Sequence, residues 1–238
     1  MVPDAQHIVR RQDVAAHRCS TGELAIGGQD HFYLETQAAW AERAGAASLE
    51  HGNAQTVDLT WTRRLTGKYK AVYDSPDIGG GLGVLRAGIV SAQYMSAFNV
   101  PASALSPVIV LRHDGIVLAM QQEYWDRYKV GEKQKVTHPW TGAPLTRNPA
   151  LLRVGEGLPA GLENHALDKQ LARGVVVLAC ALAFQDVVDT IAAADGLSAE
   201  AAATKARGMM LPGIIMQPSG VFATSVAQDN GCVYVRAT

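Results

Sequence analysis

The chain has 238 residues, of which 48% are hydrophobic and 18% are charged, enough apolar residues for one large domain or a domain with an appendage. The net charge of −1 gives no electrostatic basis for binding nucleic acid or an anionic membrane, and no apolar stretch reaches the ~20 residues of a membrane span. Cys19, Cys180 and Cys232 are too scattered for a disulfide framework, and no histidine pair has metal-ligand spacing. We therefore expect no nucleic-acid partner, no membrane association, no metal and no cofactor.

The N-terminal part reads differently from the rest of the chain. Residues 27–37 are short, polar and aromatic, and they stand outside the alternation of elements that follows. Arg10 and Arg11 form a twin arginine, but the polar segment after them is not an export signal, and a secretory hydrophobic region is missing. The sequence as written thus predicts a cytoplasmic protein, with residues 1–58 as a poorly ordered extension and 59–238 as the main domain.

From residue 69 onward, short apolar runs alternate with helical patterns. Residues 69–73 predict a strand, which Asp74-Ser75-Pro76 and a flexible glycine turn at 79–81 bring to an end. Residues 82–98 have the apolar spacing of a helix. Residues 107–111 are continuously apolar, which is typical of a parallel strand covered on both faces.

The second half continues the alternation after a long interruption. Residues 116–120 fit either a short strand or the lead into the helix that contains 123–125, and 130–162 are polar and rich in proline and glycine, which predicts a long excursion. Further helices are expected over 162–172, 181–191, 198–210, with Ser198 as its N-cap, and 221–230, and further strands over 174–180, 214–216 and 232–236. Five strands separated by helices imply an α/β fold with a mainly parallel sheet and helices on both faces.

Cys180 is the most informative residue, because it lies between an apolar strand and a helix. Open α/β sheets present their chemistry at this edge, and the N–H groups of a helix N-terminus favour a thiolate over a thiol. Cysteine is also among the most buried residue types and packs as a small apolar group. The local pattern leaves both interpretations open.

Five segments resemble a known family and cover about three quarters of the chain: LTGKYKAVYDSP (65–76), VLRH (110–113), TRNP (146–149), RGVVVLACALAF (173–184) and LPGIIMQPSG (211–220). They are similar to a bacterial family of DsrE-like proteins that often carry a twin-arginine signal. The resemblance implies a flavodoxin-like three-layer sandwich, usually a homo-oligomer, and a periplasmic location for relatives with that signal. In sulfur-relay members of the superfamily a strand-end cysteine accepts sulfur as a persulfide, and Cys180 falls at the matching position. A sulfur-donor or acceptor protein is the partner that this implies.

The segment from Gly27 to Gln37 is similar to the glycine-glycine-glutamine motif of the molybdenum-binding subunit of xanthine dehydrogenases and aldehyde oxidases. In that family the glutamine lies beside the molybdenum, and here it is Gln29. One loop cannot enclose a molybdopterin, since cofactor sites bury most of their ligand. We interpret the segment as a fragment that has replaced an export signal; a molybdenum hydroxylase fragment would instead show bound metal in elemental analysis.

Other residues are expected near Cys180 at the same edge of the sheet. His113 follows the second strand and would adjust the thiol or shuttle protons, or it is a turn histidine bonded to Asp114. Arg112 would hold an anionic substrate, or a surface carboxylate. Asp74 and Ser75 end the first strand, where many α/β folds bind phosphate.

Cys232 is a candidate resolving thiol if its strand lies beside that of Cys180, and otherwise a packed strand residue. The first hypothesis is a DsrE-like domain with a reactive thiol at Cys180 for sulfur transfer or thiol redox chemistry. The rival is a non-catalytic small-molecule-binding or oligomerisation module of the same fold with an inert Cys180. Whether the chain is an enzyme stays open.

Overall fold

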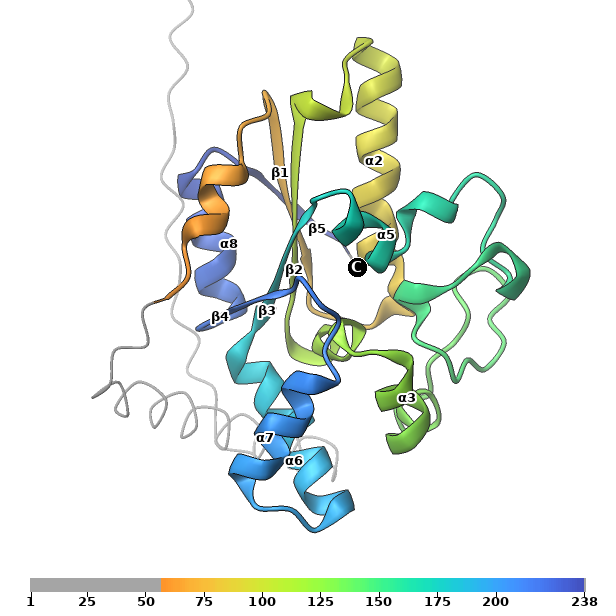
Figure 1. The fold of residues 1–238 in the computed structure, drawn as a ribbon. Helices are drawn as coiled ribbons and strands as arrows, with labels where there is room; N and C mark the ends of the chain where they lie inside the picture. The colour runs from red at the N-terminus through yellow and green to blue at the C-terminus, as the bar shows by residue number, and fades with distance from the viewer. Residues whose placement is uncertain (1–56, 238) are drawn as a thin grey trace, which may run out of the picture. The chain divides into compact units, whose positions relative to one another are not determined.

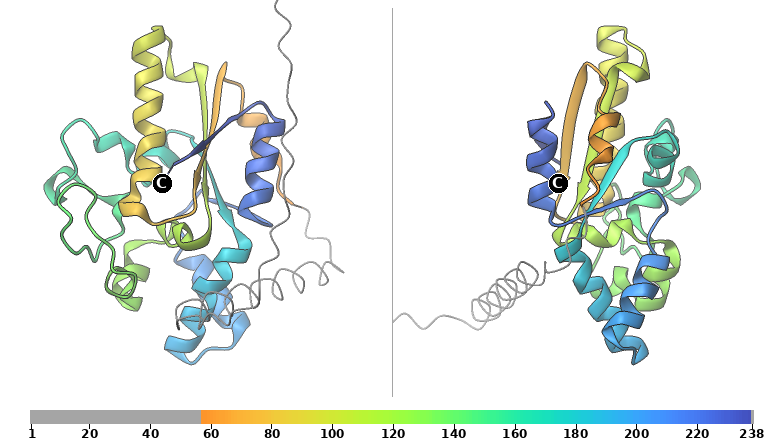
Figure 2. Two further views of the ribbon diagram at one scale, coloured as in Figure 1. Left: turned by 180° about the vertical axis from the view of Figure 1, so that it is seen from behind. Right: turned by 60° about the vertical axis from the view of Figure 1, so that its left-hand side comes forward.

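The computed structural model describes residues 57–237, which form a three-layer α/β sandwich (Figures 1 and 2). Its five strands are all parallel and lie in the order β4-β3-β2-β1-β5. They are β1 (Tyr69–Ser75), β2 (Leu105–Leu111), β3 (Val176–Cys180), β4 (Ile215–Gln217) and β5 (Val233–Arg236). The expected flavodoxin-like sandwich with a parallel five-stranded sheet is confirmed, although the strand outside β1 is β5, where the flavodoxin order places β2.

Alternate residues of each strand build the core on the two faces of the sheet. Val72 of β1 and Val110 of β2 pack with Trp61 on the face covered by α8 (Gly220–Asp229). Tyr73 and Ile109 belong to the larger core on the opposite face. Both faces are apolar because side chains alternate with a period of two and helices cover both sides, which is why the central strands read as continuous apolar runs.

The helices form two layers and a bundle beyond the carboxyl ends of the strands (Figure 1). Helix α2 (Leu82–Phe98) and the short α5 (Leu167–Ala172) lie on one face, and α8 lies on the other. Helices α6 (Ala181–Asp195) and α7 (Ala199–Gly208) pack against each other below the sheet. The expected N-cap of α7 is confirmed, since the Ser198 hydroxyl accepts the N–H of Ala201 at 3.3 Å.

The chain between β2 and β3 decides one open alternative and differs from the expectation in one place. Residues 116–120 are the lead into a helix and not a strand of the sheet: they lie largely in the 3-10 helix η4 (His113–Ala119), which leads to α3 (Gln122–Tyr128). The helix expected over 162–172 begins only at Leu167, because Ala166 is extended (φ −62°, ψ 148°) and separates it from the 3-10 turn η7 (Glu163–His165). The long excursion is confirmed: within it lie α4 (Val130–Lys133) and the 3-10 turns η5 (Pro149–Leu151) and η6 (Val154–Glu156).

The turn after β1 has a backbone conformation that favours glycine. Gly79, Gly80 and Gly81 all have positive φ, a conformation that glycine adopts without steric cost. A Cβ at Gly81 would lie 2.7 Å from the carbonyl carbon of Pro149. Glycine is therefore required at this position by both the backbone conformation and the close approach of the excursion.

Several expectations fall outside the described residues. The twin arginine, Cys19, the molybdenum-motif residue Gln29 and all of the expected extension (1–58) except its last two residues lie within residues 1–56. Among the helices of residues 57–237, none is both long and apolar enough to cross a bilayer.

Candidate functional site

Cys180 is the last residue of β3 and the N-cap of the 15-residue helix α6. Its Sγ accepts the backbone N–H of Ala183 at 3.4 Å. Cys180 is 6% exposed, and the rest of β3 is buried as well. The helix N-terminus offers N–H groups and the positive end of its dipole to this sulfur, an environment that stabilises an anion.

The register of the sheet fixes the neighbours of Cys180. Cys180 and Gln217 are Cα partners between β3 and β4, and the pairing of Leu111 with Ala179 places Arg112 beside Cys180 on the other side. Gln217 is buried; its amide nitrogen donates to the carbonyl oxygens of Asp58 and Met216, while its Oε1 has no partner among the described residues. Gln217 was not among the predicted site residues. The feature that could have indicated it is its place as a polar residue at the end of an apolar strand, immediately before a proline.

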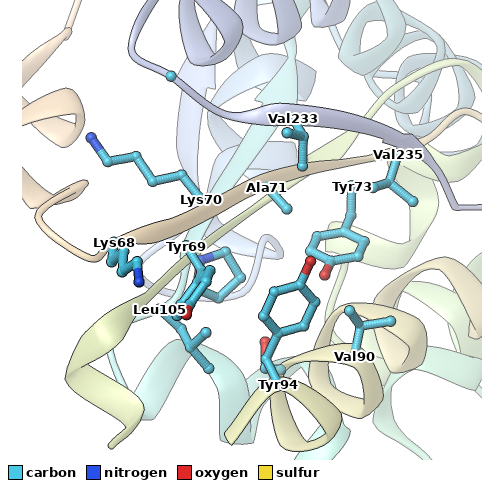
Figure 3. A pocket seen from close by; sticks show the side chains of 13 residues that line it. Lys68, Tyr69, Lys70, Ala71, Tyr73, Val90, Tyr94, Leu105, Val233 and Val235 are labelled. Atoms are coloured by element: carbon cyan, nitrogen blue, oxygen red, sulfur yellow. The ribbon is translucent and has the colours of Figure 1, made fainter. Parts of the chain in front are cut away.

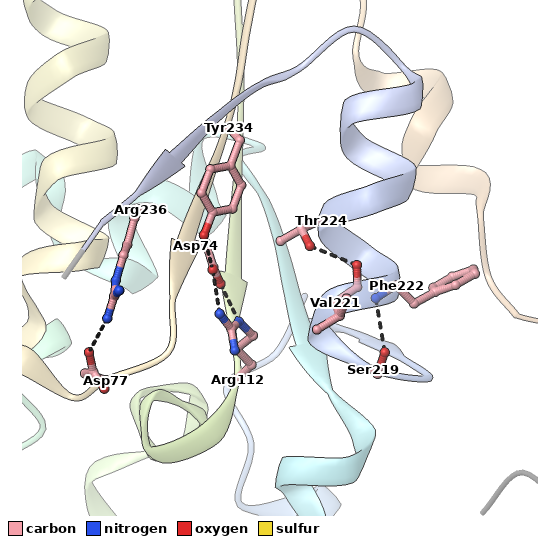
Figure 4. A network of polar contacts seen from close by, with 9 residues as sticks. All are labelled: Asp74, Asp77, Arg112, Ser219, Val221, Phe222, Thr224, Tyr234 and Arg236. Carbon is pink, nitrogen blue, oxygen red and sulfur yellow. Dashed lines mark hydrogen bonds and ion pairs between the residues drawn. The ribbon is translucent and has the colours of Figure 1, made fainter. Parts of the chain in front are cut away.

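Arg112 binds a carboxylate of the protein rather than standing free (Figure 4). Its Nε and Nη2 donate to the two oxygens of Asp74 at 2.6 and 2.8 Å, and the Tyr234 hydroxyl donates to Asp74 at 2.6 Å. The hydrogen bond to Asp74 raises the pKa of Arg112 and also that of Tyr234. The second interpretation of Arg112, a carboxylate as its partner, therefore describes the structure except in one respect: Asp74 is buried, at 1% exposed, and does not lie on the surface.

The same network joins three elements at the carboxyl edge. Asp74 belongs to β1, Arg112 follows β2, and Tyr234 belongs to β5. Arg112 also lies against the first turn of α8, where a Cβ at Gly220 would come within 2.6 Å of the Arg112 Cβ. An anionic substrate would have to use the remaining nitrogen of Arg112 or displace Asp74. Tyr234, like Gln217, was missed because its role depends on a strand pairing that local sequence does not reveal.

His113 lies on a different part of the edge from the Cys180 sulfur. It is exposed, has φ 45°, and lines a small cavity of about 100 Å³ with Asp114, Asp186 and Thr190. Cys180 is not part of that cavity lining, and no hydrogen bond joins the two side chains in the described part of the chain. The expected imidazole–thiol pair is therefore not assembled as a direct contact.

Ser75 and Cys232 are both placed away from an open site. Ser75 is 1% exposed and its hydroxyl, unpartnered among the described residues, lies under α2, where a Cβ at Gly83 would be 2.4 Å from it. Cys232 precedes β5, which pairs with β1, so two strands separate it from β3. Within one chain the condition for a resolving thiol, a strand beside that of Cys180, is not met, because three strand spacings of about 4.8 Å exceed the reach of a disulfide. Cys232 is instead a packed residue that is 5% exposed, which was the other interpretation. Burial raises the pKa of Cys232, an effect that Lys70 partly opposes.

The side chains that commonly bind metal ions are scattered in the described part of the chain. Within residues 57–237, histidine, cysteine and carboxylate side chains do not gather in groups of three or more that could hold a metal ion. The class that the fold and this edge define is a parallel α/β domain with a thiol at a strand-to-helix junction. The sequence matches no protein-family model, and no curated protein or solved structure shows significant similarity to it.

Proposed function

We propose that the protein accepts and passes on sulfur at Cys180, as a DsrE-like domain would. The observation that carries this proposal is the hydrogen bond from the Ala183 N–H to the Cys180 Sγ at the start of α6. Backbone N–H donation favours a thiolate, which is the nucleophilic form of cysteine.

The proposed step is a sulfur exchange that needs no external oxidant. The Cys180 thiolate attacks the terminal sulfur of a donor persulfide, R–S–SH. A new S–S bond forms on Cys180, the S–S bond of the donor breaks, and the electron pair leaves with the donor thiolate. The transferred sulfur keeps its proton. The thiolate of an acceptor protein then takes the same sulfur from Cys180 by the same exchange.

The low exposure of Cys180 has two consequences for this proposal. It shields a persulfide from small reductants, and it requires a partner that reaches the start of α6. The expected cytoplasmic location is part of this proposal, because a reducing compartment keeps a single thiol free. The expected homo-oligomer is part of the proposal as well.

A second candidate function rests on the same burial. At 6% exposure and without a contact to His113, Cys180 would be an inert core residue of a binding or oligomerisation module. The two candidates differ in one measurable property, the reactivity of Cys180 in the folded protein.

The test uses a chain in which Cys180 is the single cysteine, made by Cys19→Ser and Cys232→Ser, with Cys180→Ser added as the control. The protein is treated with glutathione persulfide, and intact mass is recorded before and after addition of an acceptor thiol. The sulfur-carrier proposal expects a species heavier by one sulfur atom that disappears with the acceptor. Modification only after unfolding in urea would refute sulfur transfer and support the inert module.

A further inference from the structure

A cavity of about 230 Å³ lies on the α2 face of the sheet, near the outer strand β5 (Figure 3). Helix α2 packs on β1 and β2, so the strip of β5 beyond β1 is open on this side. Val233 of β5 is 61% exposed. This cavity is separate from Cys180, which lies at the opposite end of a different strand.

The walls of the cavity are aromatic and aliphatic. Tyr69 and Tyr94 meet edge to face with ring centroids 5.3 Å apart, and Phe98 stacks on Tyr69 at 5.4 Å. Leu105 and Val235 complete the apolar lining. Since a cavity of about 150 Å³ holds benzene, this one has room for a single substituted ring.

Tyr73 provides a polar group inside this apolar lining. The residue is 2% exposed, yet its hydroxyl forms no hydrogen bond with the described residues. Figure 3 shows the hydroxyl directed into the cavity toward that of Tyr94. Burial, with a contribution from Tyr94, raises the pKa of Tyr73 to about 12, so the group stays a neutral donor. The hydroxyl is not one of the fully buried polar atoms that lack a partner, so the cavity leaves it accessible to a ligand that can accept its hydrogen bond.

The charged groups of the lining are all positive. Lys68 and Lys70 line the cavity, and no carboxylate does. Lys68 Nζ lies 5.0 Å from the centroid of the Tyr69 ring, and Lys70 Nζ donates to the carbonyl of Asn230 at 3.3 Å. Lys68 is thus the cation available to an anionic ligand at the rim.

We propose that this cavity binds a small aromatic carboxylate. The ring lies against Tyr69 and Tyr94, the carboxylate reaches Lys68, and a ring substituent accepts the hydrogen bond of Tyr73. This site goes beyond the proposed sulfur transfer and depends on none of its residues.

The test is calorimetric titration of the full chain with 4-hydroxybenzoate, whose two polar groups match Lys68 and Tyr73. A ligand of this size is expected to bind with a Kd of about 1 mM or tighter. Tyr73→Phe should weaken binding about fivefold or more through the lost hydrogen bond. Tyr124→Phe is the matched control, because Tyr124 is an equally buried tyrosine in α3, outside the cavity lining, and its variant should bind normally.

Two controls make the result specific. Benzylamine, a single ring that carries a positive charge, should not bind to the protein. The Cys180→Ser variant should bind 4-hydroxybenzoate as tightly as the unmodified chain does. The proposal is overturned if 4-hydroxybenzoate gives no saturable binding up to about 10 mM, or if Tyr73→Phe binds as tightly as the unmodified chain. Loss of sulfur transfer with intact binding would separate the two proposals.

Discussion

The ion pair between Arg112 and Asp74 should respond very unequally to removal of its two partners. The Asp74 side chain is 2% exposed and that of Arg112 is 20% exposed. Replacing Arg112 with Met leaves a carboxylate in the interior whose one remaining side-chain partner within residues 57–237 is the Tyr234 hydroxyl. Replacing Asp74 with Asn removes a charge but leaves a guanidinium that water reaches.

The expected magnitudes follow from this difference in burial. Breaking a buried pair so that one charge is left uncompensated costs about 3–5 kcal/mol, which is our expectation for Arg112→Met. Asp74→Asn keeps an acceptor for the Arg112 Nε and should cost about 1–2 kcal/mol. Arg153→Met is the matched control: Arg153 also donates two hydrogen bonds to one carboxylate, from Nη1 and Nη2 to Asp168, but the side chains are 42% and 33% exposed, so it should cost about 0–1 kcal/mol.

The assay is urea unfolding followed by tryptophan fluorescence, for which Trp61 and Trp125 provide fully buried reporters. The three variants should rank Arg112→Met, Asp74→Asn, Arg153→Met from most to least destabilised. If Arg112→Met costs no more than Arg153→Met, the Asp74 carboxylate does not depend on this partner and the reasoning is wrong.

Three other predictions concern Gly220, His165 and Cys232; the first two use the same unfolding assay and the third uses alkylation. Gly220→Ala should lower the free energy of unfolding by about 1–3 kcal/mol, because its Cβ would lie 2.6 Å from the Arg112 Cβ. The control is Gly208→Ala in α7, whose Cβ would meet nothing within 4 Å and which should stabilise the protein; a stabilising Gly220→Ala would contradict the prediction. Burial lowers the pKa of His165, so the unfolded chain takes up the proton first and the free energy of unfolding should fall as the pH drops below about 6.5. His165→Gln should reduce this dependence, and an identical pH profile in that variant would refute the prediction. Burial raises the pKa of Cys232, so in a chain retaining only this cysteine, alkylation at pH 8 should be slower folded than in urea, and equal rates would exclude the effect.

Local sequence was sufficient for most of the elements. The apolar run of β3 and the helical spacing that follows place Cys180 at a strand-to-helix junction, and the structure has it there. Ser198 predicted the start of α7 because a hydroxyl before a helix satisfies free N–H groups. The start of α5 was wrong because Ala166 is extended in the structure, and nothing in its side chain signals this conformation.

The composition of the sites was harder to predict, because it depends on which strands become neighbours. Arg112 was singled out with an anionic substrate or a surface carboxylate as the alternatives for its partner, whereas the partner is Asp74, supplied by the adjacent buried strand. Tyr234 was missed because β5, the last strand in the chain, pairs with β1, the first. Gln217 was missed for the same reason, since only the pairing of β4 with β3 brings it beside Cys180.

Strand β5, which lies beside β1, contributes side chains to both faces of the sheet, and the two groups of residues that they join are independent of each other. Tyr234 pairs with Val72 and faces α8, where it donates to Asp74. Val235 pairs with Tyr73 and faces the cavity beside α2. Because adjacent strand residues point to opposite faces, a change at Val235 alters the cavity and leaves the ion-pair network in place. The same argument holds in reverse for Tyr234, so the outer strand allows each site to be disabled separately in the same folded chain.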